Sequence, residues 1–331
     1  TPQFIADRLS DLQSVEGEHL SFAFTSFGVQ EADIYDISAL SEYQALTYIK
    51  LKTNIISDAS ALNGLPRLRE LYLNENKIVS FTGISLPSLE ILDLSSNQLR
   101  SIGHLSLPKL KKLILSQNKI CYVAPTAFQE LTELNSLILT ENKIKSFKPN
   151  VFKTLSKLET LLLDQNQILN IPEELFDGLT GLKKLNLNEN GTETIAGLSL
   201  LTALETLELQ QSGVQSIDDI KPLIDLKALK SINFDGSPVS SADNFRSDVI
   251  LMLPWIETID EEAITFSERQ EALQLDEERK AEAERERLER EAAERATSEE
   301  TDQKNEEEDR SDTKTEETNE SYSTYYESDA K

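Results

Sequence analysis

The residues that most often carry chemistry are few in this chain and lie far apart. His19 and His104 are its only histidines and stand 85 positions apart, and Cys121 is its only cysteine. A transition-metal site needs several such ligands at short, regular spacing, so we predict no metal site, and we expect Cys121 to be a buried or partly buried structural thiol. The chain also has no glycine-rich phosphate loop, no G-x-S-x-G motif and no evident acid–base pair among its 59 acidic residues. We therefore expect a protein that is not an enzyme and that binds no cofactor and no small-molecule substrate.

Asparagines, whose side-chain amides can form hydrogen bonds, recur along the chain at regular intervals. Nine segments between Leu46 and Val239 follow the pattern L-x-x-L-x-L-x-x-N-x-I, with a spacing of 21 to 25 residues. An amide can both donate to and accept from backbone groups that a turn leaves unpaired, so the stacked asparagines should form a buried ladder. A serine hydroxyl can satisfy only part of that pattern. The position is filled by Asn54, Asn76, Asn97, Asn118, Asn142, Asn166 and Asn190, and then by Ser212 and Ser237.

The alternation of apolar and polar residues in each segment predicts a short β-strand. In Leu68–Leu73, for example, Leu71 and Leu73 would point inward, while Glu70 and Tyr72 would face solvent. This period and consensus are the signature of leucine-rich repeats. We therefore expect an α/β leucine-rich-repeat solenoid over residues 33–240. A curved parallel sheet would form its concave face, and short helical or extended segments would form its convex face.

The three longest repeats carry an additional aromatic residue fourteen positions before their asparagine, with a proline just upstream. We expect a helical turn there on the convex side, with the aromatic rings stacked from one repeat to the next. The aromatic residues are Phe128, Phe152 and Phe176, and the prolines are Pro125, Pro149 and Pro172.

The two ends of such a solenoid need caps, because a terminal repeat cannot bury its apolar face without a neighbour. Over residues 1–32 we expect a helix from Phe4 to Leu12, followed by a degenerate first repeat. Over residues 241–265 we expect a short helix that folds over the last strand, with Trp255 closing the core. The degenerate first repeat would contain Phe22, Phe24, Phe27 and Val29.

Beyond the cap the composition becomes strongly acidic. Residues 261–331 hold 26 acidic and 11 basic residues, a net charge of −15 out of −26 for the whole chain. Residues 266–297 lack glycine and proline and place opposite charges four residues apart, as in Asp276 and Lys280, so we expect a charged single helix. Its apolar residues are too few and too irregular to decide between a solvated helix and one that docks on a partner. Residues 298–331 should form a disordered acidic tail.

Composition also indicates a reducing compartment and protein partners. A single cysteine can form no intramolecular disulfide, and the paired cysteines that cap extracellular leucine-rich repeats are absent. No apolar run approaches the length of a membrane span, and the N-terminus lacks the basic-then-apolar pattern of a signal peptide. A net charge of −26 would repel nucleic-acid phosphates. We expect a cytoplasmic protein whose partners are proteins, with no nucleic acid and no membrane.

The solvent-facing positions of the strands predict where a partner would bind. The middle position of each strand runs through Ile114, Ile138 and Leu162 in three consecutive repeats, and Ile91 joins them diagonally. Contiguous exposed apolar residues often mark an interface, although incidental apolar surface or cover by the chain's own tail is the alternative. Lysines on the N-terminal side and acids on the other could orient a bound segment. The candidate partner-binding residues are Tyr72, Ile91, Ile114, Ile138, Leu162, Lys111, Lys112 and Asp164.

Three parts of the chain, in their order, resemble intracellular leucine-rich-repeat proteins of cilia and flagella, most closely the leucine-rich-repeat protein of the axonemal radial spoke. They are the stretch YDISALSEYQALTYIKLKTNIISDASALNGLPRLRELYLNENKI, the cap from Phe245 to Asp260 and the helix ERKAEAERERLERE. The resemblance implies a structural adaptor of the axonemal cytoskeleton, with radial-spoke subunits as partners. The long repeats depart from this family, since PTAFQEL, PNVFKTL and PEELFDGL resemble the repeat type usual in extracellular receptors.

Other classes of protein use the same combination of solenoid, cap and acidic tail. A regulatory subunit of a phosphatase and an acidic nuclear histone-binding factor both remain alternatives, although 11 basic residues interrupt the acidic run that a histone would bind. Extracellular recognition rests on the long repeats alone and is disfavoured by the cysteine count.

Overall fold

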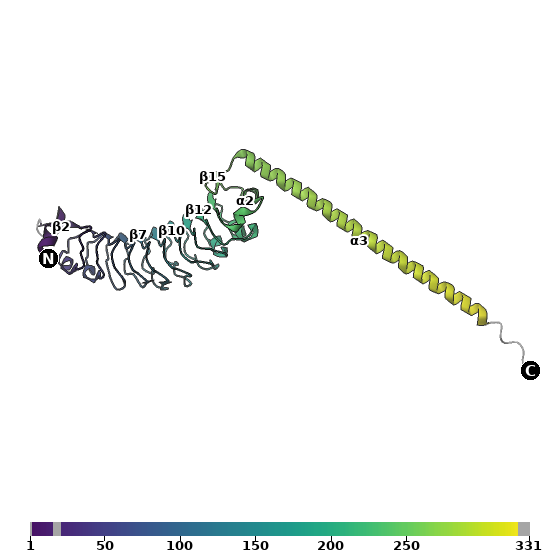
Figure 1. The fold of residues 1–331 in the computed structure, drawn as a ribbon, viewed down its shortest axis with the longest axis horizontal. Helices are drawn as coiled ribbons and strands as arrows, with labels where there is room; N and C mark the ends of the chain where they lie inside the picture. Colours follow the sequence, from purple (N-terminus) through teal and green to yellow (C-terminus); the bar gives the residue numbers. More distant parts are fainter. Residues whose placement is uncertain (1, 16–20, 324–331) are drawn as a thin grey trace, which may run out of the picture. The chain divides into compact units, whose positions relative to one another are not determined.

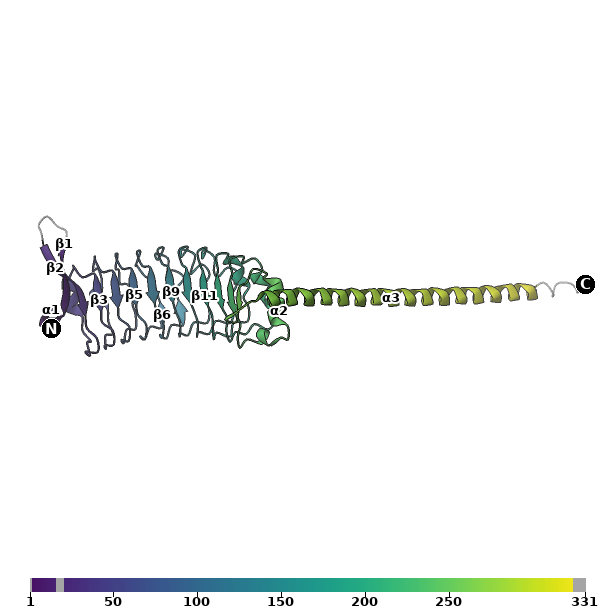
Figure 2. The same cartoon turned by 90° about the horizontal axis from the view of Figure 1, so that it is seen from above.

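The computed structural model describes the backbone of residues 2–15 and 21–323, and the side chains of residues 4–14 and 22–295. It divides into two compact units, Thr1–Arg269 and Gln270–Lys331, which are described separately below. The first unit is a solenoid in which the strands of successive repeats lie side by side (Figures 1 and 2). The expected fold class is therefore confirmed.

The solenoid is organised around one sheet whose strands follow the order of the chain, apart from a separate two-stranded sheet of β6 and β8. From β2 to β14 the neighbouring strands are parallel, and only the terminal pairs β1–β2 and β14–β15 are antiparallel. The strands of the main sheet are β1 (Leu9–Val15), β2 (Ser21–Gly28), β3 (Tyr48–Lys50), β4 (Glu70–Tyr72), β5 (Ile91–Asp93), β7 (Lys112–Ile114), β9 (Ser136–Ile138), β10 (Thr160–Leu162), β11 (Lys184–Asn186), β12 (Thr206–Glu208), β13 (Ser231–Asn233), β14 (Thr258–Ile259) and β15 (Glu262–Ala263).

Each three-residue strand buries its central residue and leaves the residues on both sides at least partly exposed, except that Asn233 of β13 is also buried. The strands pair without offset, so that Leu113 of β7 aligns with Leu137 of β9. This is the inward and outward alternation that the sequence predicted. A row of outward side chains therefore contains the same position of every repeat.

The asparagine ladder forms as predicted. Asn118 Nδ2 donates to the carbonyl oxygens of Leu94 (2.9 Å), Leu115 (3.1 Å) and Ser116 (3.1 Å), and its Oδ1 accepts from the Leu99 N–H at 3.0 Å. Neighbouring asparagines make the equivalent bonds, and each one joins its own repeat to the preceding one.

The two serines replace only part of this network. Ser237 Oγ accepts from the Ser212 N–H at 3.0 Å and donates to the Leu209 carbonyl at 3.0 Å. A hydroxyl has one hydrogen, so it cannot also hold the carbonyls of its own turn as the amide does.

The convex side mixes short 3-10 helices, a second small sheet and turns. The stacking of aromatic rings is confirmed: the Phe128 and Phe152 ring centroids lie 6.1 Å apart at 9°, and Phe152 and Phe176 lie 6.1 Å apart at 31°. Where the sequence predicted a helical turn, the chain around these rings forms consecutive turns, with bonds between residues three apart such as that from the Leu131 N–H to the Phe128 carbonyl (3.0 Å). The regular convex elements are η1 (Ser38–Glu42), η2 (Ser60–Leu62), η3 (Ala196–Leu200), η4 (Ile217–Leu223), η5 (Pro238–Ser241), β6 (Ser101–Ile102) and β8 (Tyr122–Val123).

The N-terminal segment differs from the expected helix. Helix α1 covers only Pro2–Ala6, and β1 then pairs antiparallel with β2. An unpaired β2 would expose a row of backbone donors and acceptors at the edge of the sheet, which a strand can satisfy and a helix cannot. Of the expected first repeat, Phe27 and Val29 are buried, whereas Phe22 and Phe24 are exposed.

At the C-terminal end of the solenoid, helix α2 (Phe245–Met252) precedes the short hairpin of β14 and β15. The indole N–H of Trp255 donates to the Leu226 carbonyl at 3.0 Å, and Lys227 Nζ lies 3.6 Å from the centre of the indole ring. Trp255 thus fixes the cap to the preceding repeat.

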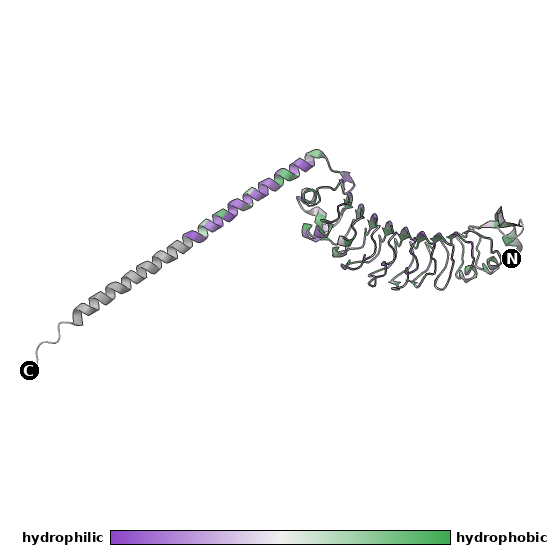
Figure 3. Ribbon diagram, turned by 180° about the vertical axis from the view of Figure 1, so that it is seen from behind, coloured by the Kyte–Doolittle hydropathy of each residue, from purple (hydrophilic) through white to green (hydrophobic). Residues whose placement is uncertain are grey.

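Helix α3 extends over Phe266–Ser323, whereas the sequence predicted a helix over 266–297 and disorder from 298 onward. No glycine or proline interrupts this range, and its many glutamates, lysines and arginines favour a helix. Residues 324–331 of the expected tail lie outside the described residues. Figure 3 shows that α3 is largely hydrophilic where its side chains are described.

Candidate functional site

The expected apolar surface is assembled by the register of three strands. Ile114, Ile138 and Leu162 are aligned partners in β7, β9 and β10, and all three are partly exposed. Ile91 in β5 aligns with Lys112, so it lies diagonally beside Ile114. We call Ile91, Ile114, Ile138 and Leu162 the aliphatic patch.

Tyr72 lies at the N-terminal border of the aliphatic patch, and Asp93 stands between it and Ile114 in the middle row. The Tyr72 hydroxyl donates to Glu70 Oε2 at 2.9 Å, and its ring lies 5.6 Å from that of Tyr48. Burial, followed by the hydrogen bond to Glu70, raises the pKa of Tyr72 to about 12. Tyr72 is therefore a neutral side chain held in one orientation.

More of the charged side chains beside the aliphatic patch form ion pairs than the sequence suggested. Lys111 Nζ lies 2.6 Å from Glu90 Oε2, and Lys52 pairs with Glu75 at 3.1 Å. Within the described part of the chain, Lys112 has no ion-pair partner. Asp164 accepts a hydrogen bond from the Thr140 hydroxyl at 2.8 Å. Lys112 and Asp164 are thus the two candidate residues that keep a net charge beside the patch.

A row of ion pairs between repeats accounts for the pairing of Lys111, and sequence reasoning missed it. Its members stand one residue after the first leucine of each repeat, where the sign of the charge alternates between several neighbouring repeats. That alternation of charge is the sequence feature from which the ion pairs could have been predicted. Exposed pairs of this kind add little stability. The pairs are Arg69–Glu90 (3.9 Å), Lys111–Glu90 (2.6 Å), Lys183–Glu159 (3.0 Å) and Lys230–Glu205 (2.6 Å).

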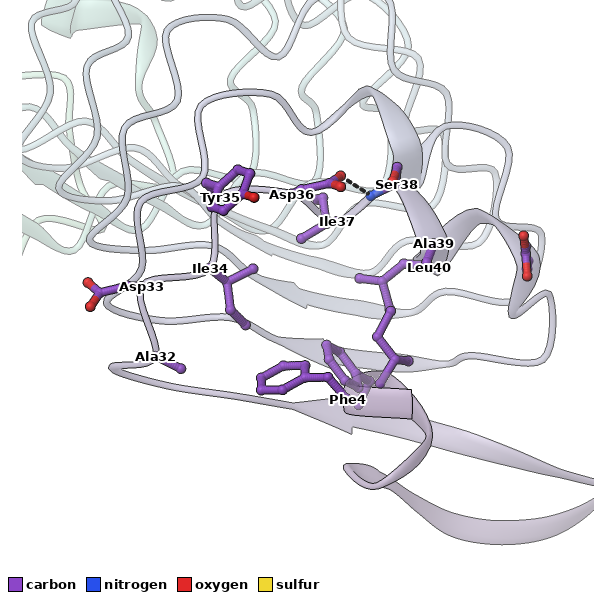
Figure 4. A pocket seen from close by; sticks show the side chains of 13 residues that line it. Phe4, Ala32, Asp33, Ile34, Tyr35, Asp36, Ile37, Ser38, Ala39 and Leu40 are labelled. Carbon is purple, nitrogen blue, oxygen red and sulfur yellow. Dashed lines mark hydrogen bonds between the residues drawn. The ribbon is translucent and has the colours of Figure 1, made fainter. Parts of the chain in front are cut away.

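A cavity of about 670 Å³ opens at the N-terminal end of the solenoid (Figure 4). Its walls come from α1, β2 and the segment 32–40, and include Phe4, Ile5 and Phe27. The Asp36 carboxylate accepts from the Ser38 N–H at 2.8 Å, and this bond lowers the pKa of Asp36. Asp36 thus fixes the local turn, and no pattern of residues indicated the cavity.

The described residues include no group of three histidine, cysteine, aspartate or glutamate side chains placed to hold a metal ion. His104 Nε2 lies 3.0 Å from Glu130 Oε1, which gives it a structural partner, and His19 lies outside the described residues. Cys121 is exposed, contrary to the expectation of a buried or partly buried structural thiol. It lies between the buried Ile120 and the exposed Tyr122 of β8.

None of the helices in the described part of the chain combines the length and the apolar character needed to cross a membrane.

Three leucine-rich-repeat profiles match the chain: "Leucine rich repeat" over residues 108–168, "Leucine-rich repeat" over 175–288 and "Leucine Rich repeats (2 copies)" over 87–125. A protein described as probable U2 small nuclear ribonucleoprotein A′ of Caenorhabditis elegans is 33% identical over 75 residues. That match covers 23% of this chain and 30% of the relative, so the chain spans less than a third of the relative's length.

Two solved structures are similar in fold. An internalin from Listeria monocytogenes shares 24% identity with a TM-score of 0.44, over 70% of this chain and 78% of that one. TLR13 in its complex with ssRNA13 shares 22% identity with a TM-score of 0.43, over 72% of this chain and 47% of that one. The strand ladder and the profile matches together establish that this chain carries a leucine-rich-repeat solenoid.

Proposed function

We propose that this protein is a non-catalytic scaffold that binds a protein partner through the aliphatic patch. The observation that carries the proposal is the alignment of Ile114, Ile138 and Leu162 on three adjacent strands of a face that is otherwise mainly polar. An apolar segment of a partner would remove these side chains from water.

The charges around the patch support one orientation of the partner. Lys112 aligns with Ile91 at the N-terminal border, and Asp164 follows Leu162 at the other. A bound segment with an acidic residue toward Lys112 and a basic residue toward Asp164 would match both charges. The protein's net charge of −26 favours partners with basic surfaces.

Two cellular settings are proposed for this scaffold. The resemblance to ciliary and flagellar proteins supports an adaptor of the axoneme that joins radial-spoke subunits, although none of the relatives named above is an axonemal protein. The similarity to probable U2 small nuclear ribonucleoprotein A′ supports a nuclear ribonucleoprotein particle as the second setting. A phosphatase complex and histone binding are further alternatives.

The test compares partner recovery by the full-length protein and by a double variant, Ile138→Asp with Leu162→Asp, in native pull-downs from the source cells. Two charges in the patch should reduce recovery by about tenfold or more, since each must be desolvated against apolar surface. The matched control carries Val79→Asp and Leu169→Asp, which replace exposed apolar residues outside the patch. Equal recovery by both double variants would exclude the patch as the binding surface. The identity of the recovered proteins decides between the axonemal and the nuclear setting.

A further inference from the structure

The surface that follows the asparagine ladder carries a strip of positive charge, although the whole chain has a net charge of −26. In the repeats of Asn76, Asn97, Asn118 and Asn142, the residues one, three, four and six positions after the asparagine are at least partly exposed. These positions hold six cations and no carboxylate. We call the six the cationic strip: Lys77, Arg100, Lys119, Lys143, Lys145 and Lys148.

The stacking of the repeats brings these cations together. Buried residues two and five positions after each asparagine, such as Ile120 and Val123, hold the segment against the core. The Lys119 N–H donates to the Leu99 carbonyl at 2.9 Å, and the next repeat continues the pattern with the Lys143 N–H. Equivalent positions of neighbouring repeats are about 4.8 Å apart, so the strip extends about 15 Å along the solenoid. It includes residues of β6 and β8 on the convex side and is separate from the aliphatic patch.

The cations of the strip lack the partners that lysines elsewhere on the solenoid have. Lys157 Nζ lies 2.7 Å from Glu133 Oε2, and ion pairs between repeats also hold Lys183 and Lys230. Within the residues whose side chains the structure describes, none of the six cations of the strip forms an ion pair. Like charges on neighbouring strands repel each other, so an anion bound across the strip would stabilise it.

The carboxylates nearest in sequence do not neutralise the strip. Glu75 and Glu141 directly precede the asparagines of two of its repeats. Glu75 pairs with Lys52 at 3.1 Å, and Glu141 accepts from Gln117 Nε2 at 3.1 Å. Both carboxylates thus have partners outside the strip, and its positive charge remains available to a ligand.

The length of the strip favours a short anion. Exposed carboxylates stand in the repeats on either side of it, at Asp58 and at Glu173. An anion much longer than about 15 Å would therefore approach like charge. An extended protein chain covers this length with about five residues.

The side chains of the strip favour a protein ligand over a nucleic acid. Proteins that bind single-stranded nucleic acid combine cations with aromatic side chains on which successive bases stack. Tyr122 is the single aromatic residue among the exposed positions of the strip. Five of the six cations are lysines, whose ammonium groups act as single point charges and can each bind one carboxylate.

We propose that the cationic strip binds a short acidic segment of a protein partner, about five residues long, with carboxylates against Lys119, Lys143 and Lys145. The segment would supply the ion-pair partners that this surface lacks. The chain as a whole attracts basic surfaces, but the strip attracts an acidic one. This site goes beyond the proposed function, because it can be occupied whether or not the aliphatic patch binds a partner.

The experiment titrates the full-length protein into a hexaglutamate peptide that carries a dye of zero net charge, and follows fluorescence anisotropy at low salt. Exposed ion pairs weaken as salt screens them, so low salt gives the largest signal. We expect saturable binding with a dissociation constant in the submillimolar to millimolar range. The neutral hexaglutamine peptide should bind at least about tenfold more weakly.

The length of the peptide tests the boundaries of the strip. A dodecaglutamate peptide should bind no more than about twofold more tightly than hexaglutamate, because its additional carboxylates would approach Asp58 or Glu173. An affinity that rises tenfold or more with this doubling of length would show a general attraction for polyanions and would overturn the proposed site.

A triple variant of the strip tests the residues themselves. Lys119→Gln, Lys143→Gln and Lys145→Gln together should weaken hexaglutamate binding by about eightfold, since each exposed ion pair contributes about a factor of two. All three side chains are exposed, so the variant should fold as the unchanged protein does.

A matched triple variant controls for the change in net charge. Lys157→Gln, Lys183→Gln and Lys230→Gln remove the same three charges, but from lysines that are already paired with glutamates. The control should weaken hexaglutamate binding by less than about twofold. Absence of saturable binding, equal binding of hexaglutamine, or equal weakening by the two triple variants would each overturn the proposal. Tighter binding of hexauridylate than of hexaglutamate would overturn the choice of a protein segment in favour of a nucleic acid.

Discussion

Replacing Asn118 with alanine tests whether the amide ladder holds the repeats together. The change removes the acceptor for the buried Leu99 N–H and the donor for three carbonyls, two of them buried. An orphaned buried donor costs about 1–3 kcal/mol, and each of the three donor contacts that are lost adds about 1 kcal/mol, which gives about 4–6 kcal/mol in all. The two amide hydrogens are shared among three carbonyls, so the lower end of that range applies.

Serine at the same position should have an intermediate effect. In the C-terminal repeats, Ser237 accepts from one N–H and donates to one carbonyl. Asn118→Ser could restore both of these bonds, so its loss of stability should be about half that of Asn118→Ala.

The assay is urea unfolding of both variants followed by circular dichroism, with hydrogen exchange at the Leu99 amide as a local measure. The neighbouring Gln117→Ala is the control, because Gln117 is exposed and its side chain bonds only with exposed groups. It should change the unfolding free energy by less than about 0.5 kcal/mol. If Asn118→Ala costs less than about 1 kcal/mol, or if serine is as destabilising as alanine, then the hydrogen-bond argument is wrong.

Three further predictions concern the cap, the concave face and the convex face. The backbone N–H of Thr265 and the Arg246 guanidinium lower the pKa of Glu268 to about 2, below the 4.5 expected in the unfolded chain. The Glu268 carboxylate therefore adds stability above pH 4.5, and this stability is lost as the pH falls toward 2. After allowance for solvent screening, Glu268→Gln should lower the unfolding free energy in urea by about 1–2 kcal/mol at pH 7 and by little near pH 2. An equal loss at both pH values would contradict this account. Burial raises the pKa of Tyr72 to about 12, so Tyr72→Phe should remove the most alkaline tyrosinate step in an ultraviolet titration. Loss of a step near pH 10 instead would show that the pKa of Tyr72 is not raised. Phe152 is fully buried between two other rings, and Phe152→Ala should cost about 3–5 kcal/mol of unfolding free energy; a cost near that of an exposed side chain would show that the stack does not stabilise the long repeats.

The features that repeat along the chain could be read from the sequence. A regular pattern fixes the register of every strand at once, so the alignment of Ile114, Ile138 and Leu162 followed from counting residues from each first leucine. The asparagine ladder was predictable for the same reason. Each depends only on a residue's position within its own repeat.

The features that depend on a particular neighbour could not be read in this way. The strand at Leu9–Val15 forms because its backbone can pair with the open edge of β2. This pairing outweighs the helical spacing of the apolar residues in the segment. The pairing of Lys111 joins it to Glu90, 21 positions away, so its neutralisation is visible only when repeats are stacked. In the turn between β14 and β15, Asp260 and Glu261 both adopt positive φ (51° and 65°), which is uncommon for residues other than glycine, so this turn depends on the pairing of its two strands.

The residue-for-residue alignment of the parallel strands also constrains the shape of what can lie across them. Neighbouring strands are about 4.8 Å apart, so Ile114, Ile138 and Leu162 repeat at nearly the 5.4 Å pitch of an α-helix. An extended chain returns a side chain to the same face only every 6–7 Å, so it falls out of step sooner. A helical peptide with apolar residues at positions i, i+4 and i+7 should therefore compete for the aliphatic patch better than a peptide of alternating pattern. Equal competition by both would mean that the sheet's periodicity does not select the partner's conformation.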